Sequence, residues 1–222
     1  MNSVTEVPNV EDKKTNTSRI GRVYWIVGGV VAFLVAGWFV LQAMGVRLFG
    51  PPEFHGTVVQ SPSPEANFTL TAHTGEKMSL YDFRGKVVLI YFGYTFCPDA
   101  CPATMVELKK AKEALGRDGD KIQVLLVTLD PARDTPEVLA DYVSHFDPSF
   151  IGMTGSEDEI AAAAIPFGIF YEKREGTAAT GYLLDHTAAV AVLDQESYLR
   201  LIYPFGTRGD DIAADLAYLI NR

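Results

Sequence analysis

Cysteine is scarce in this chain. Only two of the 222 residues are cysteine, Cys97 and Cys101. Two thiols cannot form a disulfide-dense scaffold, and they cannot build a four-cysteine zinc module. The phosphate-binding patterns GxGxxG and GxxxxGK[ST] are also absent, so the sequence gives no support to nucleotide binding.

Basic charge is scarce after the first 50 residues. Residues 51–222 carry 14 basic and 25 acidic side chains, a net charge of −11, whereas residues 1–50 stand at +2. Binding of DNA or RNA needs a basic surface, so the composition argues against a nucleic-acid partner. With 48% hydrophobic residues the chain is too apolar to be disordered, and its length fits one or two domains.

Charge is missing altogether from residues 23–44, VYWIVGGVVAFLVAGWFVLQAM. A helix of 22 residues rises about 33 Å, enough to cross a bilayer core of about 30 Å. A cleaved signal peptide is the alternative, but its apolar stretch is usually shorter, and Gln42-Ala43-Met44 is a poor cleavage site. We therefore predict a single transmembrane anchor at residues 23–44.

The residues around this anchor predict how the chain is arranged. Four basic side chains precede it and a single one follows closely: Lys13, Lys14, Arg19 and Arg22 before, Arg47 after. Because positive charge tends to stay on the cytoplasmic side, we expect a cytoplasmic tail at residues 1–22 and a C-terminal part on the exported side, periplasmic or extracellular. Residues 45–66, rich in proline and glycine, predict a semi-extended tether, and residues 67–222 suit one domain.

Within residues 67–222, short apolar runs alternate with amphipathic stretches. The runs predict strands at 87–93, 122–129, 188–193 and 199–203. The amphipathic stretches predict helices near 100–115, 136–145, 157–165 and 209–220. This order of elements predicts an α/β protein with a thioredoxin-like, three-layer fold.

The two cysteines lie in TFCPDACP, just after the predicted strand that ends at Gly93. A helix N-terminus stabilises thiolates, which bind metals and exchange disulfides. Residues four apart lie on one helical face, so both sulfurs can point to one spot. The pair is therefore interpreted as metal-binding or redox-active. A purely structural disulfide is disfavoured because so short a loop removes little entropy from the unfolded chain.

Three segments in this order, TFCPDACP, LVTLDPARDTPEVLADYVSHFD and DHTAAVAVLD, resemble the Sco/SenC family of membrane-anchored, thioredoxin-fold copper proteins. The resemblance covers roughly residues 67–222. It implies that Cys97, Cys101 and His186 are ligands for copper, Cu(I) or Cu(II). It also implies a role in maturing the binuclear copper centre of cytochrome c oxidase.

The middle segment contributes Asp130, Arg133 and Asp134, which we interpret as structural residues or as supports for the ligands. The three proposed ligands should converge to within about 5 Å of one point, since copper or zinc bonds are roughly 2.0–2.3 Å long. Two thiolates and one imidazole suit Cu(I) and tolerate Cu(II), and zinc would accept the same set.

Three of the four histidines, His55, His73 and His145, are expected to be solvated, whereas His186 leads directly into an apolar run. Asp185 is predicted either to orient the His186 imidazole or to serve as a turn carboxylate. No proline occurs between Pro166 and Pro204. The cis-proline that faces the cysteines of thioredoxin-like enzymes is therefore absent, which argues against general disulfide exchange.

Two functions follow from the resemblance. The preferred one is a copper metallochaperone, not an enzyme, that delivers copper to the copper-centre subunit of cytochrome c oxidase. Another periplasmic copper carrier is a further candidate partner. The alternative is a thiol–disulfide oxidoreductase that keeps the copper-ligand cysteines of that subunit reduced, with Cys97 and Cys101 as the redox pair. A peroxidase is a third, weaker hypothesis, because only Thr95 fits the pattern it needs.

Overall fold

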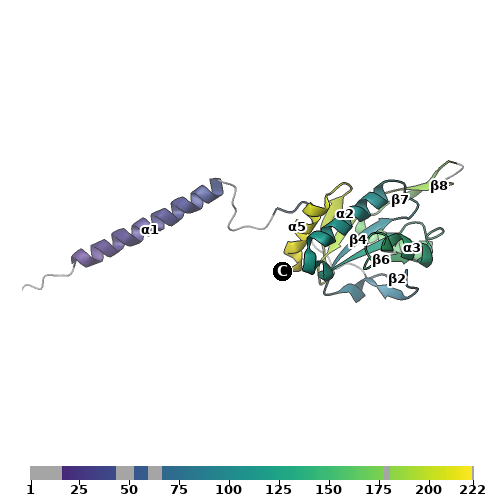
Figure 1. Ribbon diagram of the computed structural model, residues 1–222, viewed down its shortest axis with the longest axis horizontal. Helices are drawn as coiled ribbons and strands as arrows, with labels where there is room; N and C mark the ends of the chain where they lie inside the picture. The colour runs from purple at the N-terminus through teal and green to yellow at the C-terminus, as the bar shows by residue number, and fades with distance from the viewer. Residues whose placement is uncertain (1–16, 44–52, 60–66, 178–180, 222) are drawn as a thin grey trace, which may run out of the picture. The chain divides into compact units, whose positions relative to one another are not determined.

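The structure is a computed structural model that describes residues 17–43, 53–59, 67–177 and 181–221. The chain divides into two compact units, Met1–Pro51 and Pro52–Arg222. Figure 1 shows the single helix of the first unit and the α/β domain of the second. Each unit is described by itself.

The described residues of the first unit form one helix, α1 (Thr17–Ala43). Its window Tyr24–Leu41 has a mean hydropathy of 2.1 and none of it is buried, so the helix is long and apolar enough to cross a membrane. The anchor predicted at residues 23–44 falls on this helix apart from residue 44, which lies outside the described residues. The cytoplasmic tail was predicted at residues 1–22, and residues 1–16 of it also lie outside the described residues.

The second unit is built on a mixed eight-stranded sheet in the order β1-β10-β9-β4-β5-β6-β2-β3. Strands β4, β5 and β6 run parallel, and the other neighbours are antiparallel. The strands, in chain order, are β1 (Thr57–Val58), β2 (Thr69–Ala72), β3 (Lys77–Ser79), β4 (Val87–Gly93), β5 (Ile122–Thr128), β6 (Ile151–Thr154), β9 (Ala189–Leu193) and β10 (Leu199–Pro204). A separate two-stranded sheet consists of β7 (Tyr171–Glu175) and β8 (Tyr182–His186).

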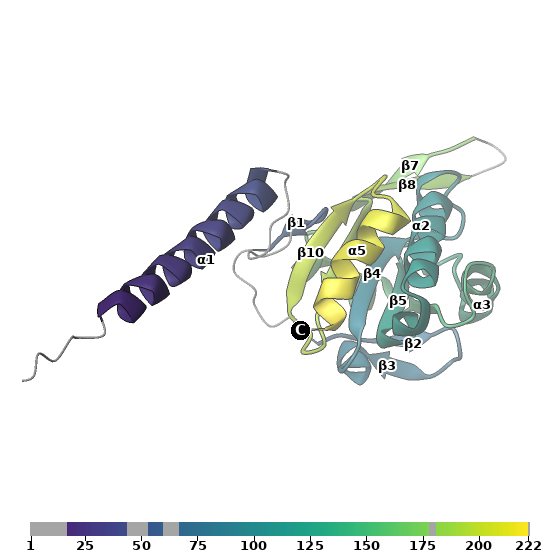
Figure 2. The same cartoon turned by 60° about the vertical axis from the view of Figure 1, so that its left-hand side comes forward.

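Helices cover both faces of the large sheet. The two longest, α2 and α5, lie side by side (Figure 2), and the Gly209 N–H donates to Glu107 Oε2 at 2.6 Å between them. The helices are α2 (Ala100–Ala114), α3 (Pro136–Ser144), α4 (Glu157–Ala164) and α5 (Gly209–Ile220), with short 3-10 turns η1 (Leu80–Phe83), η2 (Gly116–Lys121) and η3 (Ile165–Phe167).

Alternation along β4 shows why the fold has three layers. Tyr91 points toward α2, where its hydroxyl donates to Cys101 Sγ. Phe92, one residue later, points to the opposite face, because successive side chains of a strand alternate. There its ring packs against Phe167 of η3, with the ring centres 5.6 Å apart. Every residue of β4 and β5 is buried, as expected for apolar strands covered on both sides.

All four predicted strands and all four predicted helices are present, with ends that differ by at most one residue. The sequence analysis missed the short strands β1, β2, β3, β6, β7 and β8. Strand β7 has the sequence YEKRE and is largely exposed, so it shows no apolar alternation from which it could be predicted. The α/β class is confirmed.

Residues 53–59 lie in the segment predicted as a tether, yet they pack on the domain. Strand β1 pairs with β10, and the Val59 N–H donates to Arg200 O at 3.0 Å. The Phe54 and Tyr218 rings meet edge to face at 5.4 Å. Residues 44–52 and 60–66 of the segment lie outside the described residues, and the division into tether and domain stays a prediction.

Candidate metal centre

The first cysteine lies in the turn that links β4 to α2. The Cys97 N–H donates to Tyr94 O at 3.3 Å, which closes the turn. Asp134 fixes the same turn from outside: its buried carboxylate accepts from the Thr95 N–H at 3.0 Å and from Thr95 Oγ1 at 2.6 Å. It also accepts from Thr128 Oγ1 at 2.5 Å, at the end of β5. The turn is therefore tied to the two central strands of the sheet.

The second cysteine lies in the first turn of α2. The Cys101 N–H donates to Cys97 Sγ at 3.4 Å, so the helix N-terminus faces the first sulfur. Cys101 is completely buried, whereas Cys97 is half-buried. Both are free thiols. Both sulfurs meet at the start of the helix, but the predicted shared helical face is wrong, because Cys97 lies in the turn before α2.

The two thiols have pKa values shifted in opposite directions. A hydrogen bond from the Cys101 thiol holds the pKa of Cys97 far below its ordinary value, against the opposing effect of burial. The same bond, together with burial, raises the pKa of Cys101. These directions favour the thiolate on the half-buried Cys97, where a metal or a partner can reach it, and the proton on Cys101.

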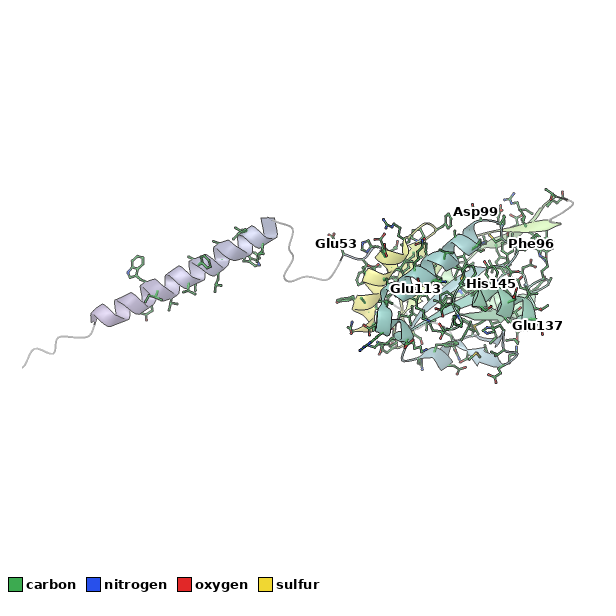
Figure 3. All side chains as sticks on the ribbon, in the orientation of Figure 1. Glu53, Phe96, Asp99, Glu113, Glu137 and His145 are labelled. Carbon is green, nitrogen blue, oxygen red and sulfur yellow. The ribbon has the colours of Figure 1, made fainter. Side chains whose placement is uncertain are left out.

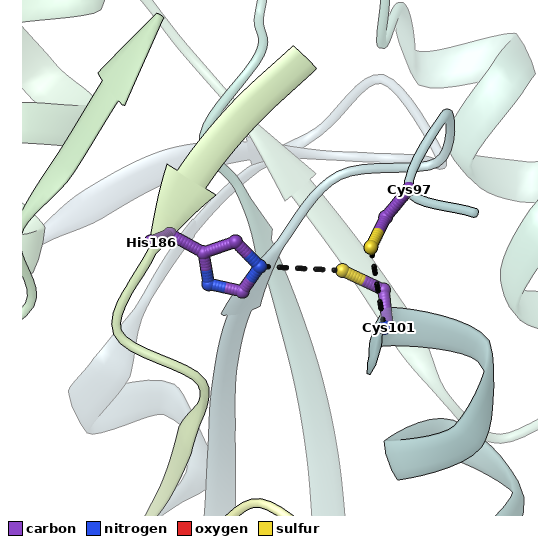
Figure 4. Close-up of side chains that lie close together, drawn as sticks. All are labelled: Cys97, Cys101 and His186. Atoms are coloured by element: carbon purple, nitrogen blue, oxygen red, sulfur yellow. Dashed lines mark hydrogen bonds between the residues drawn. The ribbon is translucent and has the colours of Figure 1, made fainter. Parts of the chain in front are cut away.

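His186 completes the cluster from the end of β8. Its Nε2 lies 3.6 Å from Cys101 Sγ, as Figure 4 shows. Its Nδ1 lies 3.2 Å from Thr187 O. A carbonyl oxygen can only accept, so Nδ1 carries a hydrogen, and Nε2 is the ring nitrogen that faces the sulfurs. The ring also meets the edges of Tyr91 and Tyr94.

The hypothesis that Asp185 orients the imidazole is wrong. Neighbouring side chains of a strand point to opposite faces, and Asp185 points outward to Arg174, whose Nε lies 2.5 Å from its carboxylate. The Thr187 carbonyl holds the imidazole instead. This role depends on a backbone group, which the residue types in the sequence do not reveal.

The remaining histidines do not join the cluster. His55 was expected to be solvated, but its ring Nδ1 lies 3.0 Å from Asp215 Oδ1. The backbone N–H of His55 also donates to the Asp215 carboxylate. The Gly152 N–H donates to His73 Nδ1. His145 is exposed at the end of α3 (Figure 3). The fold therefore selects one histidine of four for the cysteines.

The ligand atoms of Cys97, Cys101 and His186 all lie within 4.8 Å of one another. The predicted convergence is confirmed. Two sulfurs and one imidazole nitrogen form a soft donor set of the kind that copper or zinc accepts. That these residues hold a metal is a proposal, taken up below.

Three tyrosines beside the cluster escaped the sequence analysis. Tyr91 donates to Cys101 Sγ at 3.5 Å. The Tyr94 hydroxyl accepts from the Leu184 N–H at 3.2 Å, and Tyr182 donates to Asp130 Oδ1 at 2.6 Å. Of the three, only Tyr182 could have been predicted from the sequence, because it lies four residues before His186 and so on the same face of a strand.

A mostly apolar cavity of about 540 Å³ adjoins the cysteines. Its walls include Pro98 and Pro102 beside the cysteines, Ala188 two residues after His186, and Phe205 after β10.

The sheet order, the cysteine pair at the start of a helix and the histidine that faces it define a thioredoxin-like protein with a Cys–Cys–His cluster. The family model described as SCO1/SenC matches residues 58–221. The chain belongs to the SCO1/SenC family.

Individual relatives agree with this assignment. The chain is 37% identical to the SCO2-like protein of Rickettsia felis over 139 aligned residues. The alignment covers 62% of this chain and 68% of that protein. The solution structures of apo Sco1 from Thermus thermophilus are similar, with 40% identity, a TM-score of 0.68, and coverage of 75% of this chain and 97% of that one. Bradyrhizobium japonicum ScoI, solved with copper bound, has 32% identity and a TM-score of 0.65, with coverage of 71% and 99%.

Proposed function

We propose that this protein binds copper through Cys97, Cys101 and His186 and delivers it to the binuclear copper centre of cytochrome c oxidase. The observation that carries the proposal is the convergence of two sulfurs and one imidazole nitrogen within 4.8 Å. The copper-bound relative from Bradyrhizobium japonicum supports copper as the cargo. Sco proteins are described as cytochrome c oxidase assembly proteins, which supports the oxidase as recipient.

The donor set suits a carrier that accepts both oxidation states of copper. Two thiolates bind Cu(I), and the added imidazole makes Cu(II) tolerable. Cys101 is fully buried, whereas Cys97 is half-buried and carries the thiolate. A recipient thiol would therefore attack copper from the Cys97 side, while Cys101 and His186 still hold it.

The position of the domain also fits delivery to a membrane enzyme. Helix α1 fits a membrane anchor, and the excess of basic residues before it supports an exported domain. The charge of −11 on residues 51–222 would attract a basic patch on a partner and speed the encounter more than it strengthens the complex.

Copper stoichiometry of the full chain, purified in detergent, reduced and anaerobic, tests the proposal. We expect about one Cu(I) per chain, and its loss in Cys97→Ser and in Cys101→Ser. His186→Ala should keep Cu(I) but lose Cu(II), whereas His145→Ala, the control at an exposed histidine, should change neither. Normal Cu(II) binding by His186→Ala would rule out the three-ligand site.

A thiol–disulfide oxidoreductase is the second candidate, favoured by the opposite pKa shifts of the cysteine pair. A thiolate beside a protonated thiol is the arrangement that disulfide exchange requires. The two functions differ at His186, because redox cycling of the cysteines does not need an imidazole ligand. Failure to retain copper, together with rapid reduction of a Cys97–Cys101 disulfide, would favour the oxidoreductase.

A further inference from the structure

The strand that carries His186 is weakly supported by backbone pairing. Strand β8 pairs with β7 in a sheet of two, separate from the eight-stranded sheet that holds the cysteine turn. The hairpin extends from the domain (Figure 2), and four of the five residues of β7 are exposed. A two-stranded hairpin is at best marginally stable by itself. Side-chain contacts must therefore fix the imidazole against the sulfurs.

These contacts come from one face of β8. Tyr182, Leu184 and His186 alternate with outward residues and point toward the domain. The Leu184 side chain is only 4% exposed, and its N–H donates to the Tyr94 hydroxyl. The Tyr182 hydroxyl donates to Asp130. The inner face of the hairpin is thus held at its start, its middle and its end.

Arg133 is the side chain that joins this face to the cysteine turn. Its Nη1 donates to Tyr182 O at 3.1 Å, and its guanidinium lies 3.8 Å from the centre of the Tyr182 ring. The same guanidinium lies 4.8 Å from the centre of the Phe96 ring. Phe96 directly precedes Cys97.

A buried carboxylate fixes the guanidinium beside the two rings. Arg133 Nε pairs with Asp130 Oδ2, and Asp130 is 1% exposed. The Asp130 N–H in turn donates to Thr128 Oγ1 at 2.9 Å, which ties this carboxylate residue to β5. We call these four residues, Phe96, Asp130, Arg133 and Tyr182, the Arg133 cluster.

We propose that Arg133 is a positioning residue: by lying close to both Phe96 and Tyr182 it sets how firmly the His186 imidazole is held against Cys97 and Cys101. A planar guanidinium can stack on a ring and donate in its own plane at the same time, which an ammonium cannot. The proposal rests on the proposed function for the ligand set. The positioning itself is a property of the metal-free chain.

The consequence differs between the two oxidation states of copper. Two thiolates are enough for Cu(I), but Cu(II) needs the imidazole. Loosening β8 should therefore weaken Cu(II) binding and leave Cu(I) stoichiometry unchanged. A purely structural role would lower the stability of the domain and affect both states alike.

The test compares Arg133→Gln and Arg133→Lys with Arg174→Gln in the full chain. Arg174 is a matched control because it lies on β7 of the same hairpin but pairs outward with Asp185. We expect Arg133→Gln to raise the Cu(II) dissociation constant about tenfold, the effect of losing a hydrogen bond from a charged group. The nitrogen hyperfine signal of the remaining Cu(II) complex should also change. Arg133→Lys should fall between wild type and Arg133→Gln, and Arg174→Gln should match wild type.

A second readout needs no metal. Hydrogen exchange of the Leu184 amide in the copper-free chain should be about tenfold faster in Arg133→Gln than in wild type. If wild type binds no copper, the proposed function fails, while this exchange difference still tests the positioning. Unchanged exchange together with an unchanged Cu(II) signal would overturn the inference.

Tyr182→Phe keeps the test decisive if Arg133→Gln does not fold. This variant retains the ring under the guanidinium and removes only the hydrogen bond to Asp130. We expect a change in the same direction as in Arg133→Gln, but smaller. Identical Leu184 exchange in Tyr182→Phe and wild type would contradict the proposal.

Discussion

The two regions that meet at the cluster are built in different ways. The cysteine turn follows β4, a fully buried strand paired on both sides by β5 and β9. The histidine ends β8, which pairs with β7 alone and is held by side chains such as Tyr182 and Leu184. We therefore expect the cysteine turn to be the rigid region and the hairpin to be the more adjustable one.

The same substitution in each region measures this difference. Leu89 lies at the centre of β4 and Leu184 on the inner face of β8, 0% and 4% exposed. Leu89→Ala should lower the free energy of unfolding by about 4 kcal/mol, because the packed sheet cannot close the cavity. Leu184→Ala should cost about 2 kcal/mol, because the hairpin can shift into the space. Denaturant unfolding provides the values, and equal losses would contradict the comparison.

Asp134 tests how much the rigid region depends on one buried carboxylate. Asp134→Ala leaves the Thr95 N–H and the hydroxyls of Thr95 and Thr128 without their acceptor. We expect the free energy of unfolding to fall by about 3 kcal/mol, since unsatisfied buried donors are costly. Asp141→Ala on the exposed side of α3 is the control and should be nearly neutral. A loss under about 1 kcal/mol would show that the cysteine turn is stable without the Asp134 carboxylate.

Tyr94 connects the two regions, so its hydroxyl should contribute to both. Tyr94→Phe removes the acceptor of the Leu184 N–H and leaves the ring beside His186 in place. We expect a loss of about 1 kcal/mol in the free energy of unfolding, together with faster exchange of the Leu184 amide. An unchanged exchange rate would mean that β8 is held without this bond.

His55 offers the smallest effect and a reference point away from the cluster. Its hydrogen bond with Asp215 raises the pKa of His55 above the ordinary value of 6.5, against a small opposing effect of burial. The stabilisation is therefore fully present below about pH 6.5 and is lost as the pH rises through the folded-state pKa. The chain should be more stable at pH 6 than at pH 8, by a margin that shrinks in His55→Gln. An equal margin in both proteins would contradict the assignment.

Local signals were sufficient for the elements of the rigid region. Strands β4 and β5 are unbroken apolar runs, and Thr135-Pro136 marks the start of α3, where Thr135 Oγ1 accepts from the Val138 N–H as an N-cap should. The position of Cys97 and Cys101 just after such a strand also pointed to a common site at the start of a helix, although Cys97 itself lies in the turn before α2. These features need only neighbours within a few positions of the chain.

The sequence by itself thus determined the class of fold, the apolar helix that is long enough to cross a membrane, and the place of the cysteine pair. The tertiary structure decided which backbone group holds the imidazole and which side chains join β8 to the cysteine turn. The physical reason is distance along the chain. Cys101 and His186 are 85 positions apart in the sequence, and Arg133 and Tyr182 are 49 positions apart. Such contacts exist only once the sheet has placed the segments together, so no local pattern of residues encodes them.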